Sequence, residues 1–120
     1  MIAIGGAVGA IARFLVGAYV GQSMGTRFPY GTFVVNMSGC FVIGVSMTIL
    51  TDRVHLSPNW RYLIPIGFIG AYTTFSTFEY ETLRAIQDGQ WLNGGLNVLL
   101  SVVVGFVMVW LGAVAGRALA

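Results

Sequence analysis

The chain of 120 residues is 57% hydrophobic and 8% charged, with a mean hydropathy of +0.83, a composition typical of an integral membrane protein rather than a soluble domain. Its net charge of +2 comes from six arginines and four acids without any lysine, which excludes a polybasic surface for nucleic acid. His55 and the single cysteine, Cys40, have no chemical partners near them in the sequence, which argues against an enzyme, a disulfide and a cysteine-based metal site.

Four apolar stretches are long enough to cross a membrane as helices, because a hydrocarbon core about 30 Å thick needs roughly 20 residues. Polar turns that contain charged residues, proline or glycine separate them. The sequence therefore predicts a single domain, residues 1–120, with an all-α membrane fold. The four expected transmembrane helices are residues 2–21, 31–51, 62–86 and 92–118.

One charged side chain and one amide side chain stand within the first two spans. Arg13 lies near the middle of the first span, and a charge at that depth is a functional candidate by default, either in a water-filled vestibule or paired with an acid. Its positive field would concentrate anions at a pore mouth. Asn36 carries two N–H donors into an apolar span, so it needs either a hydrogen-bond partner on another helix or a wet cavity.

The third span contains the segment GAYTTFSTFEYE, residues 70–81. Gly70 is conformationally permissive and the hydroxyls of Thr73 and Thr74 can bond their own backbone, so this is where the helix would open, although the pattern alone favours an unbroken helix. A break at membrane depth requires burial in protein or contact with water. The alternative is an unbroken helix whose threonines bond back to the preceding turn.

Two aromatic residues follow the expected break. Phe75 and Phe78 are three residues apart and share a helix face, a spacing that is also common in helix cores. Ring edges carry positive charge density and attract anions weakly, which suits conduction because a permeant ion must also leave. Further along, Glu81 could act as a hydrogen-bond relay at the wide end of the polar track or pair with Arg84 three residues later, and we favour the pair; Glu79 has no assigned role.

The orientation and oligomeric state follow from charges and helix number. Four helices are too few to enclose an aqueous path alone, so oligomerisation is expected. Glycine pairs allow close helix approach, either within one chain or between two: Gly5 and Gly9, Gly17 and Gly21, and Gly112 and Gly116. Arginines near the span ends give only a weak topological bias, Arg53, Arg61 and Arg117 on one side against Arg27 and Arg84 on the other. A chain with so weak a signal could insert in both orientations, and the hypothesis that follows is an antiparallel dimer of two oppositely oriented copies.

Three segments together, GGAVGAIAR (5–13), YGTFVVNMSG (30–39) and GFIGAYTTFSTFEYE (67–81), resemble the bacterial fluoride channel family called Fluc or CrcB. The resemblance covers nearly the whole chain. It implies a dual-topology antiparallel homodimer in the lipid of the bacterial inner membrane, with two fluoride pores, through which cytoplasmic fluoride leaks out passively. It also implies a central structural Na+.

The resemblance assigns roles to particular residues. Backbone carbonyls at the break, from Gly70 and Thr73 of both chains, would offer Na+ four oxygens, a suitable set for a hard cation. Fluoride binds water strongly, so a pore must replace that water with donors. The fluoride pore would be lined by Phe75, Phe78, Asn36, Thr32, Ser76 and Thr77, with Arg13 in the vestibule.

The fourth span departs from the family pattern. Members often carry serine or threonine opposite the aromatic pair, but this chain has Val102, Val103, Val104 and Phe106 there. Ser101 and Asn97 are the nearest polar groups. The contribution of this span to the pore is therefore open, as is a heterodimer in which a sister subunit supplies the missing groups.

A small dual-topology proton-coupled multidrug exporter is the main alternative function. Such a transporter needs a titratable carboxylate at membrane depth, and only Glu79 and Glu81, near the end of the third span, could serve. An accessory subunit without transport activity would fit the size, but it would not account for Asn36, Arg13 or a broken third span.

Overall fold

The computed structural model describes all 120 residues and contains only helices. Three of them are long and apolar enough to cross a membrane: α1 (Ile2–Met24), α2 (Tyr30–Asp52) and α6 (Trp91–Leu119). Between α2 and α6 the chain forms a fourth, interrupted helical rod, the third along the sequence. It consists of α3 (Asn59–Arg61), the π-helix η1 (Tyr62–Ile69), α4 (Gly70–Tyr72) and α5 (Phe75–Gln87). The predicted all-α fold with a break in the third helix is confirmed.

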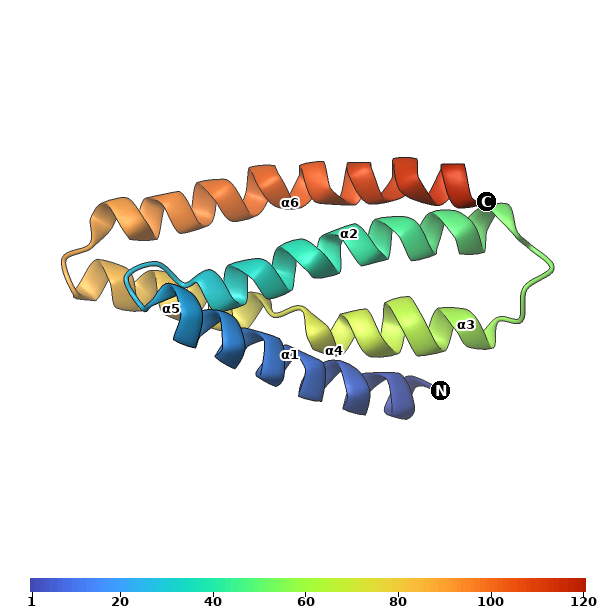
Figure 1. Cartoon of the computed structure of the whole chain (residues 1–120), viewed down its shortest axis with the longest axis horizontal. Helices are drawn as coiled ribbons and strands as arrows, with labels where there is room; N and C mark the ends of the chain where they lie inside the picture. The colour runs from blue at the N-terminus through green and yellow to red at the C-terminus, as the bar shows by residue number, and fades with distance from the viewer.

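The four rods run antiparallel in an elongated molecule of 52 × 27 × 22 Å (Figure 1). Both chain termini and the loop between α2 and α3 lie at one end, and the α1–α2 and α5–α6 turns lie at the other. At the first end Arg53 donates hydrogen bonds to the carbonyls of Leu119 and Ala120, at 3.3 and 3.2 Å. The arginines therefore divide between the two ends as the sequence predicts.

Helix α6 packs along α2, and α1 packs along η1 and α4. Glycine allows the backbones to touch in both places. A Cβ atom on Gly112 would collide with the carbonyl of Phe41, and one on Gly9 would collide with the carbonyl of Phe68. The pairs Gly5–Gly9 and Gly112–Gly116 thus serve packing within the chain.

Gly17 and Gly21 behave differently from the other pairs. A Cβ atom on either residue would meet nothing within 4 Å. Gly31 of α2 nevertheless approaches α1 closely here, since its own Cβ would lie 2.6 Å from the Gly17 carbonyl oxygen. This end of α1 therefore has an open side, which faces a cavity described below.

The break lies at Thr73 and Thr74, which both adopt extended backbone conformations. Gly70 itself is helical with φ −58°, so its conformational freedom is not what opens the helix. Thr74 instead acts as the N-cap of α5, because its hydroxyl accepts a hydrogen bond from the Thr77 N–H at 3.3 Å. A threonine that competes for backbone donors thus ends one helix and begins the next.

Few residues are buried within a single chain, 18 of 120, and large apolar side chains cover much of the outer surface. Surfaces of this kind are stable against lipid tails rather than water. Three polar side chains from α1 and α2, those of Arg13, Asn36 and Ser38, make hydrogen bonds to residues 71–74 around the break.

Candidate functional site

Asn36 of α2 holds the extended segment in place. Its Nδ2 donates to the carbonyl of Thr74 at 3.0 Å, and its Oδ1 accepts from the Thr74 N–H at 2.8 Å. The two bonds satisfy both backbone groups of a residue that has left the helix, which is essential where no water can do so. One N–H of the amide remains for another acceptor, because Asn has two.

The same contacts release two backbone carbonyls. In a continuous α-helix the N–H of Thr74 would bond Gly70, and the N–H of Thr77 would bond Thr73. Here the first N–H goes to Asn36 and the second to the Thr74 hydroxyl. Gly70 and Thr73 thereby lose their regular helical donors, and these are the two carbonyls predicted to hold Na+. Neutral backbone oxygens of this kind fit a hard monovalent cation.

Arg13 reaches the last turn of α4. Its Nε donates to the carbonyl of Ala71 at 3.1 Å, and the side chain is half-buried. The guanidinium thus stabilises the negative end of the interrupted helix. Arg13 was predicted either to line a vestibule or to pair with an acid, and the structure shows no acid within salt-bridge distance of it. Arg13 instead lines a cavity of about 270 Å³ together with Thr32, Thr74 and Thr77. We call this the middle cavity.

Phe75 and Phe78 lie together at the start of α5, with ring centroids 5.7 Å apart and ring planes inclined by 59°. Their exposure differs sharply: the Phe78 side chain is 6% exposed and that of Phe75 is 75% exposed. Both line a cavity of about 340 Å³ that also contains Asn36, Thr74 and Ser101. We call this the aromatic cavity.

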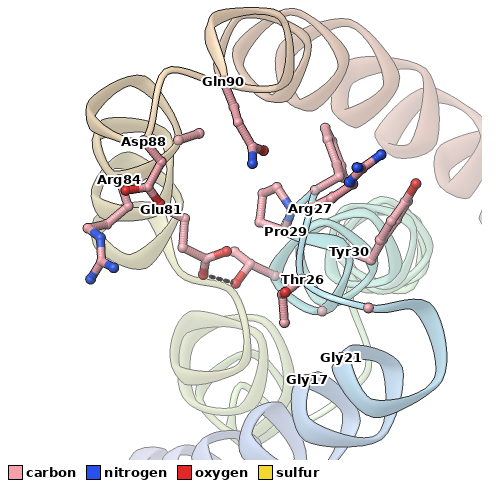
Figure 2. Close-up of a pocket in the computed structure, with 15 residues that line it drawn as sticks. Gly17, Gly21, Thr26, Arg27, Pro29, Tyr30, Glu81, Arg84, Asp88 and Gln90 are labelled. Carbon is pink, nitrogen blue, oxygen red and sulfur yellow. Dashed lines mark hydrogen bonds between the residues drawn. The ribbon is translucent and has the colours of Figure 1, made fainter.

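A third, larger hollow of about 500 Å³ opens beside the α1–α2 turn (Figure 2). We call it the mouth cavity. Its lining includes the polar residues Arg27, Thr32, Glu81 and Asp88. Gly17 and Gly21 form part of its wall, and a side chain at either position would narrow it.

The three cavities follow one another through shared residues. Thr32 lines both the mouth and the middle cavities, and Thr74 lines both the middle and the aromatic cavities. Polar groups therefore extend from one end of the molecule to the aromatic pair. The structure brings Thr32, Thr77, Asn36 and both phenylalanines into this series.

Glu81 is bonded differently from the prediction. The hydroxyl of Thr32 donates to its carboxylate, as the dashed line in Figure 2 shows. Arg84 instead extends to the other side of α5 and donates to the hydroxyl of Tyr80 at 3.5 Å. The predicted Glu81–Arg84 pair is therefore wrong, because a hydroxyl from α2 reaches the carboxylate on the half-buried side of the helix.

Ser76 and Thr77 have different surroundings. Thr77 lines the middle cavity and its hydroxyl accepts from that of Thr74 at 3.1 Å, which leaves the Thr77 proton free. Ser76 is exposed and lines none of the three cavities. Within one chain, then, Ser76 does not join the other predicted pore residues.

The sequence did not predict that Thr74 and Ser101 line the site. Thr74 was expected only to help open the helix, yet it borders two cavities and caps α5. Ser101 of α6 borders the aromatic cavity, so the fourth helix does place a hydroxyl near the ring pair. The signal for Ser101 was its polarity within an apolar span, but sequence alone could not show which way it faces.

An all-α arrangement with a lipid-compatible surface, an interrupted helix and a series of cavities that each contain hydroxyl or amide side chains defines a small multi-pass membrane transport protein. The family model described as CrcB-like protein, Camphor Resistance (CrcB), matches residues 1–113. The chain belongs to this family. The resemblance noted in the sequence is thereby confirmed.

Three curated relatives are similar to the chain along nearly their full lengths. A protein of Acidobacterium capsulatum is 56% identical over 97% of this chain and 93% of its own length. A protein of Solibacter usitatus is 50% identical over 98% of this chain and 96% of its own length. A protein of Sulfurihydrogenibium is 40% identical over 99% of this chain and 96% of its own length. All three are named fluoride-specific ion channel FluC.

Proposed function

We propose that the chain forms a fluoride-specific channel of the bacterial inner membrane, through which cytoplasmic fluoride leaves passively. The named function of its relatives supports this proposal. The structural observation that carries it is the aromatic cavity, where two phenylalanine rings meet the amide of Asn36 and the hydroxyl of Ser101. An ion channel is a transport protein, so no catalytic residues are expected.

The chemistry of this lining suits a small, strongly hydrated anion. Stripping fluoride of water in a low-dielectric interior is very costly, so donors must replace that water. The second N–H of Asn36 in the aromatic cavity and the free hydroxyl proton of Thr77 in the neighbouring middle cavity can do so without a formal positive charge. Ring edges add a weak attraction. Such neutral contacts bind the ion without trapping it.

The working unit in this proposal is an antiparallel homodimer with two pores. Phe75 is 75% exposed and Gly70 is also exposed, although both stand beside the break at membrane depth. A second copy would cover them and complete each pore. The weak arginine bias between the two ends is compatible with either orientation in the membrane.

Fluoride selectivity is tested most directly in proteoliposomes loaded with both fluoride and chloride. We expect rapid fluoride release, followed with a fluoride electrode, while chloride stays inside, because chloride is larger and the lining is built from small donors. Liposomes without protein supply the background. Equal release of both ions would contradict the selectivity, and a proton current that requires a drug would favour an exporter instead.

A structural Na+ on the two-fold axis is the second part of the proposal. In an antiparallel dimer the Gly70 and Thr73 carbonyls of both chains would meet and supply four oxygens. A ligand that binds only the assembled state stabilises it by an amount that grows with the logarithm of its concentration.

We therefore expect the dimer to melt at a higher temperature as Na+ increases at constant ionic strength, with choline as the replacement cation. Size-exclusion chromatography after heating would show whether dimers have separated into monomers. A melting temperature that does not depend on Na+ would contradict this site without affecting the channel proposal.

A further inference from the structure

Helix α5 has no helical continuity with the rod that precedes it. It begins after the extended residues Thr73 and Thr74, and the backbone groups of Thr74 bond the side chain of Asn36. The position of α5, and so of Phe78 on it, depends on contacts with neighbouring helices. Its main neighbour is α6, and its contact with α2 is slight.

One polar contact joins α5 to α6. Asn97 is the only polar residue of the chain that is buried, with 2% exposure, and its Nδ2 donates to the hydroxyl of Thr82 at 3.0 Å. No other side-chain hydrogen bond links these two helices. Gly94, one turn earlier on α6, allows the approach, since a Cβ there would lie 3.1 Å from Cγ1 of Ile86.

The contact extends to two residues that line the aromatic cavity, Phe78 and Ser101. The Thr82 hydroxyl donates its proton to the carbonyl of Phe78 at 2.9 Å, so it accepts from Asn97 while it holds the backbone of the ring residue. Ser101 donates to Oδ1 of Asn97 at 3.4 Å. This last bond is long and weak, so the Ser101 proton can turn towards an anion at little cost.

We propose that Asn97 and Thr82 are positioning residues of the pore: they fix the register of α5 on α6, and thereby place the Phe78 ring and orient the Ser101 hydroxyl. This inference deepens the proposed function and rests on it. Neither residue lines the aromatic cavity. They act on the permeating ion through Phe78 and Ser101.

The substitution Asn97→Leu separates positioning from stability. Leucine has nearly the same shape and removes an amide from the membrane interior, while Thr82 keeps its bond to Phe78. Ser101 loses only its long bond to Asn97, and it is half-buried and borders the aromatic cavity. We expect dimers that assemble and melt like the unmodified protein but conduct fluoride about tenfold more slowly, the scale of one lost hydrogen bond.

A pair of variants at position 82 isolates the hydroxyl. Thr82→Val keeps the shape and removes the hydrogen bonds, whereas Thr82→Ser keeps them. We expect slow flux in T82V and nearly full flux in T82S. Equal loss in both variants would assign the effect to packing and overturn the proposal, as would unchanged flux in both N97L and T82V.

A spectroscopic measurement tests the same proposal independently of fluoride transport. With 4-fluorophenylalanine at position 78, ¹⁹F NMR of the dimer reports the surroundings of that ring. We expect a shifted or broadened signal in N97L and T82V and recovery in T82S; identical spectra in all variants would overturn the positioning role. If the unmodified protein carries no fluoride, the proposed function fails, while the ¹⁹F signal still decides whether these residues place Phe78.

Discussion

Replacing Phe78 with isoleucine is expected to reduce fluoride flux to the background of empty liposomes while the dimer still assembles. Isoleucine keeps an apolar side chain at a site that is only 6% exposed, but it has no aromatic ring and hence no positively polarised edge. The smaller volume costs about 1–3 kcal/mol of stability, which a membrane domain tolerates. Phe75→Ile should have the same effect on flux, because both rings border the aromatic cavity. Fluoride efflux and size-exclusion chromatography measure the two outcomes.

Phe106→Ile is the matched control for the exposed ring. Phe106 is 74% exposed, almost the same as Phe75, but it lies on α6 and lines none of the three cavities. We expect this variant to conduct normally. Normal flux in both Phe75→Ile and Phe78→Ile would end the proposal that the rings recognise the ion.

The second large effect is expected from Asn36→Leu, which should abolish flux and also lower the melting temperature strongly. The substitution removes both hydrogen bonds to Thr74 and leaves one backbone N–H and one carbonyl of Thr74 without a protein partner at membrane depth. Each unpaired group of this kind costs roughly 2–7 kcal/mol. The extended segment would then shift or close, and the carbonyls of Gly70 and Thr73 would lose their arrangement.

Ser46→Ala provides the control for Asn36, since Ser46 also lies on α2 but its hydroxyl bonds only a carbonyl of its own helix, that of Ile43 at 3.3 Å. This variant should melt and conduct like the unmodified protein. A normal melting temperature in Asn36→Leu, with flux lost, would mean that the amide serves the ion alone and does not hold the break.

The sequence predicted the features that depend on local chemistry. Hydropathy located the spans, and the segment that contains Thr73 and Thr74 indicated where the third helix opens, because threonine hydroxyls compete with the helical hydrogen bonds. The aromatic spacing likewise indicated that Phe75 and Phe78 share a face. In each case the deciding interactions lie within a few residues along the chain.

Features that depend on the register between helices were missed. The rule for residues three apart favoured Glu81 with Arg84, but Thr32 arrives from α2, and nothing local shows this. The bidentate contact of Asn36 with Thr74 joins residues 38 apart. Ser101 was undervalued for the same reason, since its proximity to the rings depends on how α6 rotates against α2 and α5.

The separation of α5 from α4 also bears on how the protein is made. Helix α5 contains Glu79, Glu81 and Arg84 in thirteen residues, too polar a stretch to leave the translocon for lipid unaided. The apolar residues of η1 can insert into the membrane first. The polar helix α5 is expected to insert only when α6 is present to pack against it. We therefore expect the third transmembrane segment to insert fully only after most of α6 has been synthesised. Chains truncated before α6 should then be degraded by the cell more readily than the full-length chain.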